Sequence, residues 1–293
     1  MIRELKTFVA VAQAGSFAAA GDRIGLTQAA VSAQMQRLEA HLGFTLFERT
    51  GRSAHLNRRG AEVLAQTQAL LQQFARLGAP AQDDGRAVRL CIGAIASVQR
   101  AGLPAVLAGF HRAWPGSHSR LVPGLSMDLA DQVDAGELDL AIVIRPPFAL
   151  QSDLRWTTLE SEPFRLLVPC TTPGEDWRAL LTQQPFIRYD RTSFGGRLVD
   201  RFLRQQALPV QEVCELDELD AIVGLVAQGL GVALVPQTAA QTTTQGRWPA
   251  GVRAVDLGPQ TFHRDIGLLH RDRDTLGEAV RDLIDRIRAA YPA

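Results

Sequence analysis

The spacing of hydrophobic residues divides the chain into two parts with different periodicities. Before residue 78, apolar positions recur every three or four residues, as they do on one face of a helix. From residue 88 onward, short apolar runs alternate with helical segments, which predicts a parallel sheet covered by helices. The linking segment 78–85 (GAPAQDDG) predicts a flexible hinge between the two parts.

The stretch from Ser16 to Gly43 predicts a short helix, a tight turn at Gly25 and a longer helix. Ser16 and Thr27 are suited to cap the two helices. One face of the longer helix is apolar (Ala30, Val31, Met35, Leu38, Leu42), and the opposite face is polar (Gln28, Ser32, Gln34, Gln36, Arg37). Gln, Ser and Arg bond readily to bases and phosphates, so this profile is typical of a helix-turn-helix recognition helix. A water-exposed face on an ordinary helical pair fits the same periodicity.

Residues 44–56 favour the DNA-binding interpretation. They predict a small hairpin, or wing, with Gly51 in its turn and Arg49 and Arg52 beside it, placed for phosphates or the minor groove. Residues 1–60 contain eight basic and four acidic residues, a net charge of +4 in a chain whose total is zero. Positive charge therefore gathers where a polyanion would bind.

The sequence from Leu5 to Leu56 resembles the N-terminal domain of LysR-type transcriptional regulators, most specifically in the run TQAAVSAQMQRLEAHLGFTLFER. The resemblance covers nearly the whole chain. It implies an α/β protein with an N-terminal all-α/winged-helix domain: a winged helix-turn-helix, a long dimerising linker helix and a two-lobed, periplasmic-binding-protein-like α/β effector domain. Two departures are Ala29, where the family often has Pro, and Asn57, which replaces a Thr but is still suited to cap a helix.

We expect this domain to bind double-stranded promoter or operator DNA. The contacts are expected from the helix caps, the polar helix face and the wing. The candidate DNA-binding residues are Ser16, Thr27, Gln28, Ala29, Ser32, Gln34, Arg37, Arg49 and Arg52.

The predicted domains are a winged helix-turn-helix at 1–58, a linker helix and hinge at 59–86, and an effector domain at 87–293. Within the effector domain, lobe I comprises 87–163 and 264–293, and lobe II comprises 164–263. Leu64, Thr67, Leu71 and Phe74 alternate at spacings of three and four, which predicts a linker helix with a stripe wide enough for a partner helix. A helix packed on its own domain is the alternative; the adjacent flexible segment favours pairing into a homodimer or tetramer.

Three polar loops follow predicted strands and are candidates for an effector site. Ligands of open α/β sheets bind beyond the carboxyl ends of strands, near helix N-termini. The candidate effector-binding residues are Ser97, Val98, Leu125, Ser126, Arg145, Thr192, Ser193 and Phe194. The resemblance places effector contacts after the first strand, near Ser97, and a small carboxylate is one candidate effector. Simple capping by the serines, and a solvated Arg145, fit the same residues.

The sequence predicts no catalytic, metal or cofactor site. Its six histidines lack ligand spacing, and it has no G-x-S-x-G, P-loop or G-x-G-x-x-G motif. Three separated cysteines predict buried thiols (Cys91, Cys170, Cys214). No apolar run reaches about 18 residues and no secretory signal is seen, so we expect a cytoplasmic protein without a membrane segment. The leading hypothesis is an effector-responsive transcription regulator; a solute-binding protein, and a regulator with a vestigial pocket controlled by a protein partner, are the alternatives.

Overall fold

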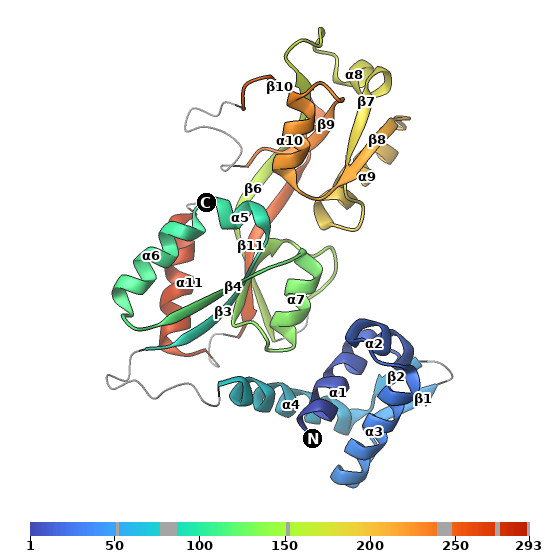
Figure 1. The fold of residues 1–293 in the computed structure, drawn as a ribbon, viewed down its shortest axis with the longest axis vertical. Coiled ribbons are helices and arrows are strands. Elements are labelled where there is room, and N and C mark those ends of the chain that lie inside the picture. The colour runs from blue at the N-terminus through green and yellow to red at the C-terminus, as the bar shows by residue number, and fades with distance from the viewer. Residues whose placement is uncertain (51–52, 77–86, 151–152, 239–247, 273–275, 292–293) are drawn as a thin grey trace. The chain divides into compact units, whose positions relative to one another are not determined.

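The computed structural model describes residues 1–50, 53–76, 87–150, 153–238, 248–272 and 276–291. The chain forms two units: the first holds α1 to α4 with a hairpin, and the second runs from β3 to α11 (Figure 1). Each unit has its own buried apolar residues.

The first unit is a winged helix-turn-helix. It contains α1 (Ile2–Ala14), α2 (Phe17–Ile24), α3 (Gln28–Leu42), the antiparallel hairpin β1 (Phe47–Thr50) and β2 (Ser53–Leu56), and α4 (Arg58–Arg76). The ring of Phe47 meets the edges of Phe8 and Phe17, with centroids 5.6 Å apart in each pair. The turn between α2 and α3 uses Gly25 at φ 69°, a left-handed conformation that other residues rarely adopt. The predicted helix-turn-helix and hairpin are therefore confirmed.

The linker helix α4 follows the predicted helical periodicity over its 19 residues. Asn57 caps it, because the Gly60 amide donates to its Oδ1 at 2.8 Å. Val63, Leu64 and Leu71 pack against the core of the winged unit, whereas Leu70 and Phe74 remain 47% and 45% exposed. Part of the apolar stripe of α4 thus packs within its own unit, and part of it is exposed.

Lobe I of the second unit is a mixed sheet with helices against it. Its strands follow the order β6 (Leu154–Pro169), β11 (His263–Arg271), β5 (Leu140–Ile144), β3 (Arg89–Ala94) and β4 (His118–Pro123). Its helices are α5 (Ala96–Arg100), α6 (Leu103–Ala113), α7 (Ser126–Asp134) and α11 (Glu278–Ala290). Strands β4, β3 and β5 are parallel, but β11 is antiparallel to β5 and β6. The predicted parallel pairing is therefore confirmed for β3, β4 and β5, and the antiparallel strands β6 and β11 extend that sheet.

Lobe II is built on the far half of β6. That half pairs with β9 (Ala233–Pro236) and β10 (Val252–Val255), while β7 (Pro185–Tyr189) pairs in parallel with β8 (Gln211–Leu216). A bridge between Phe186 and Val232 ties the two strand groups together. The lobe's helices are α8 (Trp177–Gln183), α9 (Phe194–Gln205) and α10 (Leu219–Ala227), with the short 3-10 turn η1 (Gly258–Gln260) before β11.

The two lobes are joined by paired long strands. Strand β6 runs for 16 residues and pairs with β11 from Leu154–Arg271 to Pro163–His263, so both strands pass from one lobe to the other (Figure 1). The sequence segment Phe164–Val168 is mostly apolar and marks only the second part of β6 as a strand. The run 155–162 shows little apolar alternation because most of its side chains are exposed or half-buried.

The expectation of buried cysteines also changes. Cys170 is exposed rather than buried, while Cys91 and Cys214 are half-buried. A turn with Gly229 at φ 79° follows the end of α10. Among the described helices, none combines the length and apolar character that crossing a membrane requires.

Candidate functional site

The outward face at the start of α3 is the candidate DNA-reading surface. Thr27 caps α3 by accepting from the Ala30 amide at 3.2 Å, and Ser16 caps α2 by accepting from the Ala19 amide at 3.1 Å. Gln28 and Ala29 are exposed on the first turn, and Ser32 is half-buried one turn later. Each cap satisfies a free amide in the first turn of its helix and so stabilises the start of α2 or α3.

Gln34 and Arg37 are engaged by α1 instead of standing free. Thr7 donates through Oγ1 to Gln34 Oε1 at 2.6 Å, and Arg37 Nε lies 3.4 Å from a carboxylate oxygen of Glu4. Gln34 therefore lies half-buried against α1, not on an open polar face, and its predicted contact with DNA stays a prediction. Arg37 keeps an exposed side chain.

The predicted wing is present as a two-stranded hairpin. Its register pairs Arg49 with Ala54 and Thr50 with Ser53. Arg52 and the side chain of Arg49 lie outside the described part of the structure, so their predicted contacts with DNA stay predictions.

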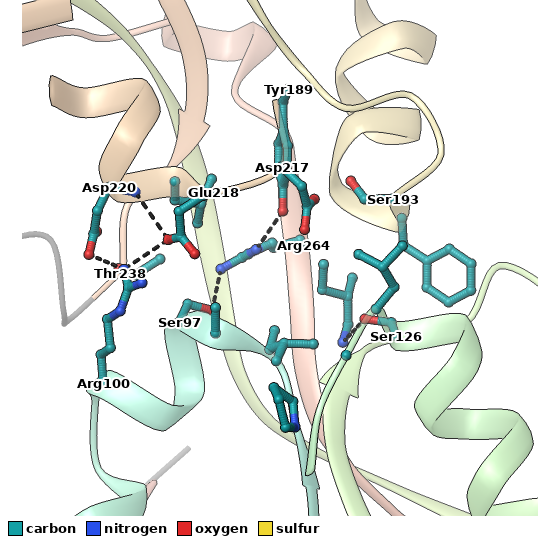
Figure 2. A pocket seen from close by; sticks show the side chains of 18 residues that line it. Ser97, Arg100, Ser126, Tyr189, Ser193, Asp217, Glu218, Asp220, Thr238 and Arg264 are labelled. Carbon is teal, nitrogen blue, oxygen red and sulfur yellow. Dashed lines mark hydrogen bonds and ion pairs between the residues drawn. The ribbon is translucent and has the colours of Figure 1, made fainter. Parts of the chain in front are cut away.

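A cavity of about 270 Å³ lies between the two lobes of the second unit. Figure 2 shows its polar side chains converging from α5, α7, β7, α9, β11 and the loop before α10. The cavity is lined by Ile95, Ala96, Ser97, Arg100, Pro123, Gly124, Leu125, Ser126, Ile144, Tyr189, Ser193, Phe194, Asp217, Glu218, Leu219, Asp220, Thr238 and Arg264. A concave site with an apolar wall and a few convergent polar groups is typical of a small-molecule pocket.

Arg264 organises the polar floor of this cavity. It is 1% exposed and makes a buried ion pair with Glu162, with 2.5 Å between Nε and Oε2. Its other nitrogens donate to Tyr189 Oη at 3.3 Å and to Ser97 Oγ at 3.1 Å (Figure 2). These partners come from the hinge strand β6, from lobe II and from lobe I, so one guanidinium connects all three.

The two hydroxyl groups that accept hydrogen bonds from Arg264 can themselves act as donors. Because Ser97 and Tyr189 each accept a hydrogen bond from Arg264, the O–H hydrogen of each is not used in that bond and can be donated to another acceptor. Burial raises the pKa of Tyr189 above its usual 10.0, which keeps this hydroxyl protonated. The floor of the cavity therefore offers hydrogen-bond donors to an acceptor such as a carboxylate.

The lobe II side of the cavity is acidic. Asp217, Glu218 and Asp220 all line it at the start of α10, and Glu218 caps that helix. Burial raises the pKa of Asp217 above 3.8, and its Oδ1 atom has no hydrogen-bond partner in the described residues. Arg100 of α5 reaches across from lobe I to Glu218, with Nη1 and Oε1 2.8 Å apart, and also pairs with Asp220. This exposed ion pair links α5 of lobe I to the start of α10 in lobe II at the cavity wall (Figure 2).

The start of α9 is packed tightly against β7 and the loop after it. The Gly196 amide donates to Ser193 Oγ at 3.0 Å, and Ser193 donates to the Asp190 carbonyl at 2.9 Å. A Cβ atom on Gly196 would lie 1.8 Å from that same carbonyl oxygen. Only glycine fits this approach, so it fixes Ser193 and Phe194 at the cavity wall.

The structure brings five of the eight predicted effector residues into the cavity: Ser97, Leu125, Ser126, Ser193 and Phe194. Val98 instead packs in the core of lobe I, Thr192 bonds the Asp190 carboxylate, and Arg145 lies outside, 3.7 Å from Asp265. Ser193 is a helix cap, whereas Ser97 is not.

Ser126 is tied to the sheet, since its Oγ accepts from the Ile144 amide at 3.1 Å. Sequence reasoning missed Arg264, Tyr189 and Asp217, which a local pattern does not mark because their partners are distant along the chain. Among the described residues, no group of three or more His, Cys, Asp or Glu side chains is arranged to hold a metal ion.

A winged helix-turn-helix unit and a two-lobed unit with a polar cavity together define a DNA-binding protein of the ligand-responsive class. Comparison with known families agrees: residues 2–61 match the bacterial regulatory helix-turn-helix proteins of the lysR family, and residues 83–292 match the LysR substrate binding domain. The chain belongs to the LysR family of transcriptional regulators.

Individual relatives cover most of the chain. It is 31% identical to a probable nitrogen assimilation transcriptional activator of Synechococcus elongatus, over 81% of this chain and 79% of that protein. It is also 31% identical to the HTH-type transcriptional regulator IlvR of Caulobacter vibrioides, over 87% of each. A full-length OxyR variant from Pseudomonas aeruginosa is similar in structure, with a TM-score of 0.58 and 26% identity over 98% of this chain and 97% of that one.

Proposed function

We propose that this regulator binds a dyad-symmetric operator as a dimer or dimer of dimers, and that a small polar effector in the interlobe cavity changes that binding. The observation that carries the proposal is the cavity itself. Two hydroxyl groups bonded to Arg264, one from Ser97 in lobe I and one from Tyr189 in lobe II, line it. An effector that bonds both Ser97 and Tyr189 favours one arrangement of the lobes over another. Such differential affinity is what any ligand-driven change requires.

The effector class follows from the charge pattern of the cavity. The hydroxyls of Ser97 and Tyr189 suit a carboxylate or another acceptor, while Asp217 and Glu218 on the opposite side suit a hydroxyl or amino group. We therefore favour a small hydroxy acid or amino acid over a purely apolar compound.

DNA reading is assigned to the first turns of α3. Gln28 and Ser32 lie toward the exposed start of the helix, where recognition helices meet base edges. Arg49 and Arg52 of the wing are assigned to the phosphate backbone or minor groove. Leu70 and Phe74 on α4, exposed in the single chain, are assigned to pairing with a second copy.

No enzymatic role is proposed, since the relatives with names are transcriptional regulators. We place the protein in the cytoplasm because that is where its DNA partner is found.

The test is a thermal-shift screen of the full chain against small hydroxy acids, amino acids and aromatic acids, followed by operator binding with each compound that raises Tm. We expect one compound class to stabilise the protein and to change DNA affinity. Ser97→Ala and Tyr189→Phe should each lose that stabilisation. Ligand binding without any DNA affinity would favour a solute-binding protein. DNA binding without any stabilising compound would favour a vestigial pocket.

A further inference from the structure

A second cavity in the effector unit is rich in arginine. It has a volume of about 270 Å³ and is lined by Ile144, Arg145, Pro147, Phe194, Arg197, Leu198, Arg201 and Arg204. Ile144 and Phe194 also line the first cavity, so the two cavities share a wall. Ligand binding in this second space is a separate matter from the effector site proposed above.

Both lobes contribute arginines to this cavity. Arg197, Arg201 and Arg204 recur on α9 at spacings of four and three, which puts them on one exposed face, while Val199 and Phe202 are buried on the other. Arg145 follows the end of β5 in lobe I. Four arginines from the two lobes therefore line one cavity.

Nearby carboxylates balance only part of this charge. Asp200 lies 2.8 Å from Arg204, one helical turn away, and Asp265 lies 3.7 Å from Arg145. Arg197 lies over the ring of Phe194 at 5.7 Å, and neither it nor Arg201 has an ion-pair partner in the described residues. Like charges held together without counter-charges repel one another, so the site favours an anion.

The shape of the cavity limits the kind of anion. Ile144, Pro147 and Leu198 give it an apolar lining, and planar guanidinium groups bind carboxylate and phosphate oxygens in pairs. We propose that this arginine cavity is a second binding site, for a small multiply charged anion such as a di- or tricarboxylate or a phosphate ester. An anion held by Arg145 on one side and by Arg197 and Arg201 on the other links the two lobes.

One consequence rests on the effector site proposed above: anion binding in the arginine cavity is coupled to ligand binding in the first cavity. Because Phe194 and Ile144 form the shared wall, an anion that draws α9 toward β5 also sets the position of the effector-facing wall. Each ligand then alters the affinity of the other by the same factor.

The experiment is isothermal titration and thermal shift on the full chain with citrate and with inorganic pyrophosphate, at ionic strength matched with sodium chloride. Sodium acetate serves as the monovalent control. We expect citrate, pyrophosphate or both to raise Tm beyond acetate, and the difference between the two identifies carboxylate or phosphate as the preferred chemistry.

The variants decide where the anion binds. Arg197→Ala/Arg201→Ala should fold normally, since both side chains are exposed, and should weaken anion binding at least tenfold. Arg112→Ala/Arg281→Ala removes the same charge from exposed positions on α6 and α11 and should bind as the unaltered protein does. Equal affinity in the two double variants, or no stabilisation beyond acetate, would overturn the proposal.

Discussion

The buried ion pair of Arg264 and Glu162 gives the sharpest test of how the lobes are held. The two side chains come from adjacent hinge strands and are 1% and 5% exposed. Arg264→Met keeps much of the side-chain volume but leaves the Glu162 carboxylate buried without a counter-charge. Removing one partner of such a pair costs about 3–5 kcal/mol, and the hydrogen bonds to Ser97 and Tyr189 are lost with it.

The size of the effect should depend on pH. Burial already raises the pKa of Glu162 above 4.5, while Arg264 opposes the rise. Without Arg264 that pKa rises further, so the folded variant binds a proton that the unfolded chain has released. Its free energy of unfolding must then fall as pH rises through this range, and the variant should be weaker at pH 8 than at pH 5.

Urea unfolding followed by tryptophan fluorescence measures this directly. All four tryptophans (Trp114, Trp156, Trp177, Trp248) lie in the second unit, so their signal reports on the lobes and not on the DNA-binding unit. The matched control is Arg264→Met/Glu162→Leu, which removes both charges and should recover most of the loss. A loss below about 1 kcal/mol for Arg264→Met, or no recovery in the double variant, would refute the reasoning.

Further predictions concern the cavity, α9 and the linker helix. Asp217→Asn should raise Tm at pH 7.5 but little at pH 4, because the raised pKa of Asp217 means that ionisation opposes folding; an equal gain at both pH values would contradict this. Gly196→Ala should cost about 1–3 kcal/mol in urea unfolding through overpacking. Gly224→Ala, with no atom within 4 Å of its new Cβ, should stabilise α10 by about 0.5–1 kcal/mol. A Gly196→Ala variant that is more stable to urea than Gly224→Ala would contradict both predictions. Leu70→Ser/Phe74→Ser should shift the protein toward monomer in sedimentation, and an unchanged mass would rule out pairing through this stripe.

The sequence predicted those helices and turns that are stabilised by residues close to one another along the chain. The caps at Ser16 and Thr27 depend on residues three positions away, so their bonds follow from composition and spacing alone. The same holds for the wing and for most helices of the lobes. The first half of β6 was missed because its partner strand lies about a hundred residues later, and its polar side chains give no apolar alternation.

The cavity was only half predictable for the same reason. Ser97 and Ser193 follow strands, a rule that sequence carries, whereas Arg264 is bonded to groups 167, 75 and 102 residues away. In the sequence, Arg264 stands before an apolar run, a pattern that predicts an exposed residue at the start of a strand. Val98 differs from Ser97 by one position on a short helix, which is enough to turn it from the cavity into the core.

Operator binding over a series of salt concentrations tests the central claim most directly. Fluorescence anisotropy with DNA from the region upstream of this protein's own gene should show log K falling linearly with log salt, by about 0.9 per phosphate contacted. Gln28→Ala/Ser32→Ala should weaken specific binding by about 1–3 kcal/mol per lost base contact while leaving binding to unrelated DNA unchanged. An affinity that does not fall with salt, or a double variant that still prefers the operator as strongly as the unaltered protein, would contradict the account.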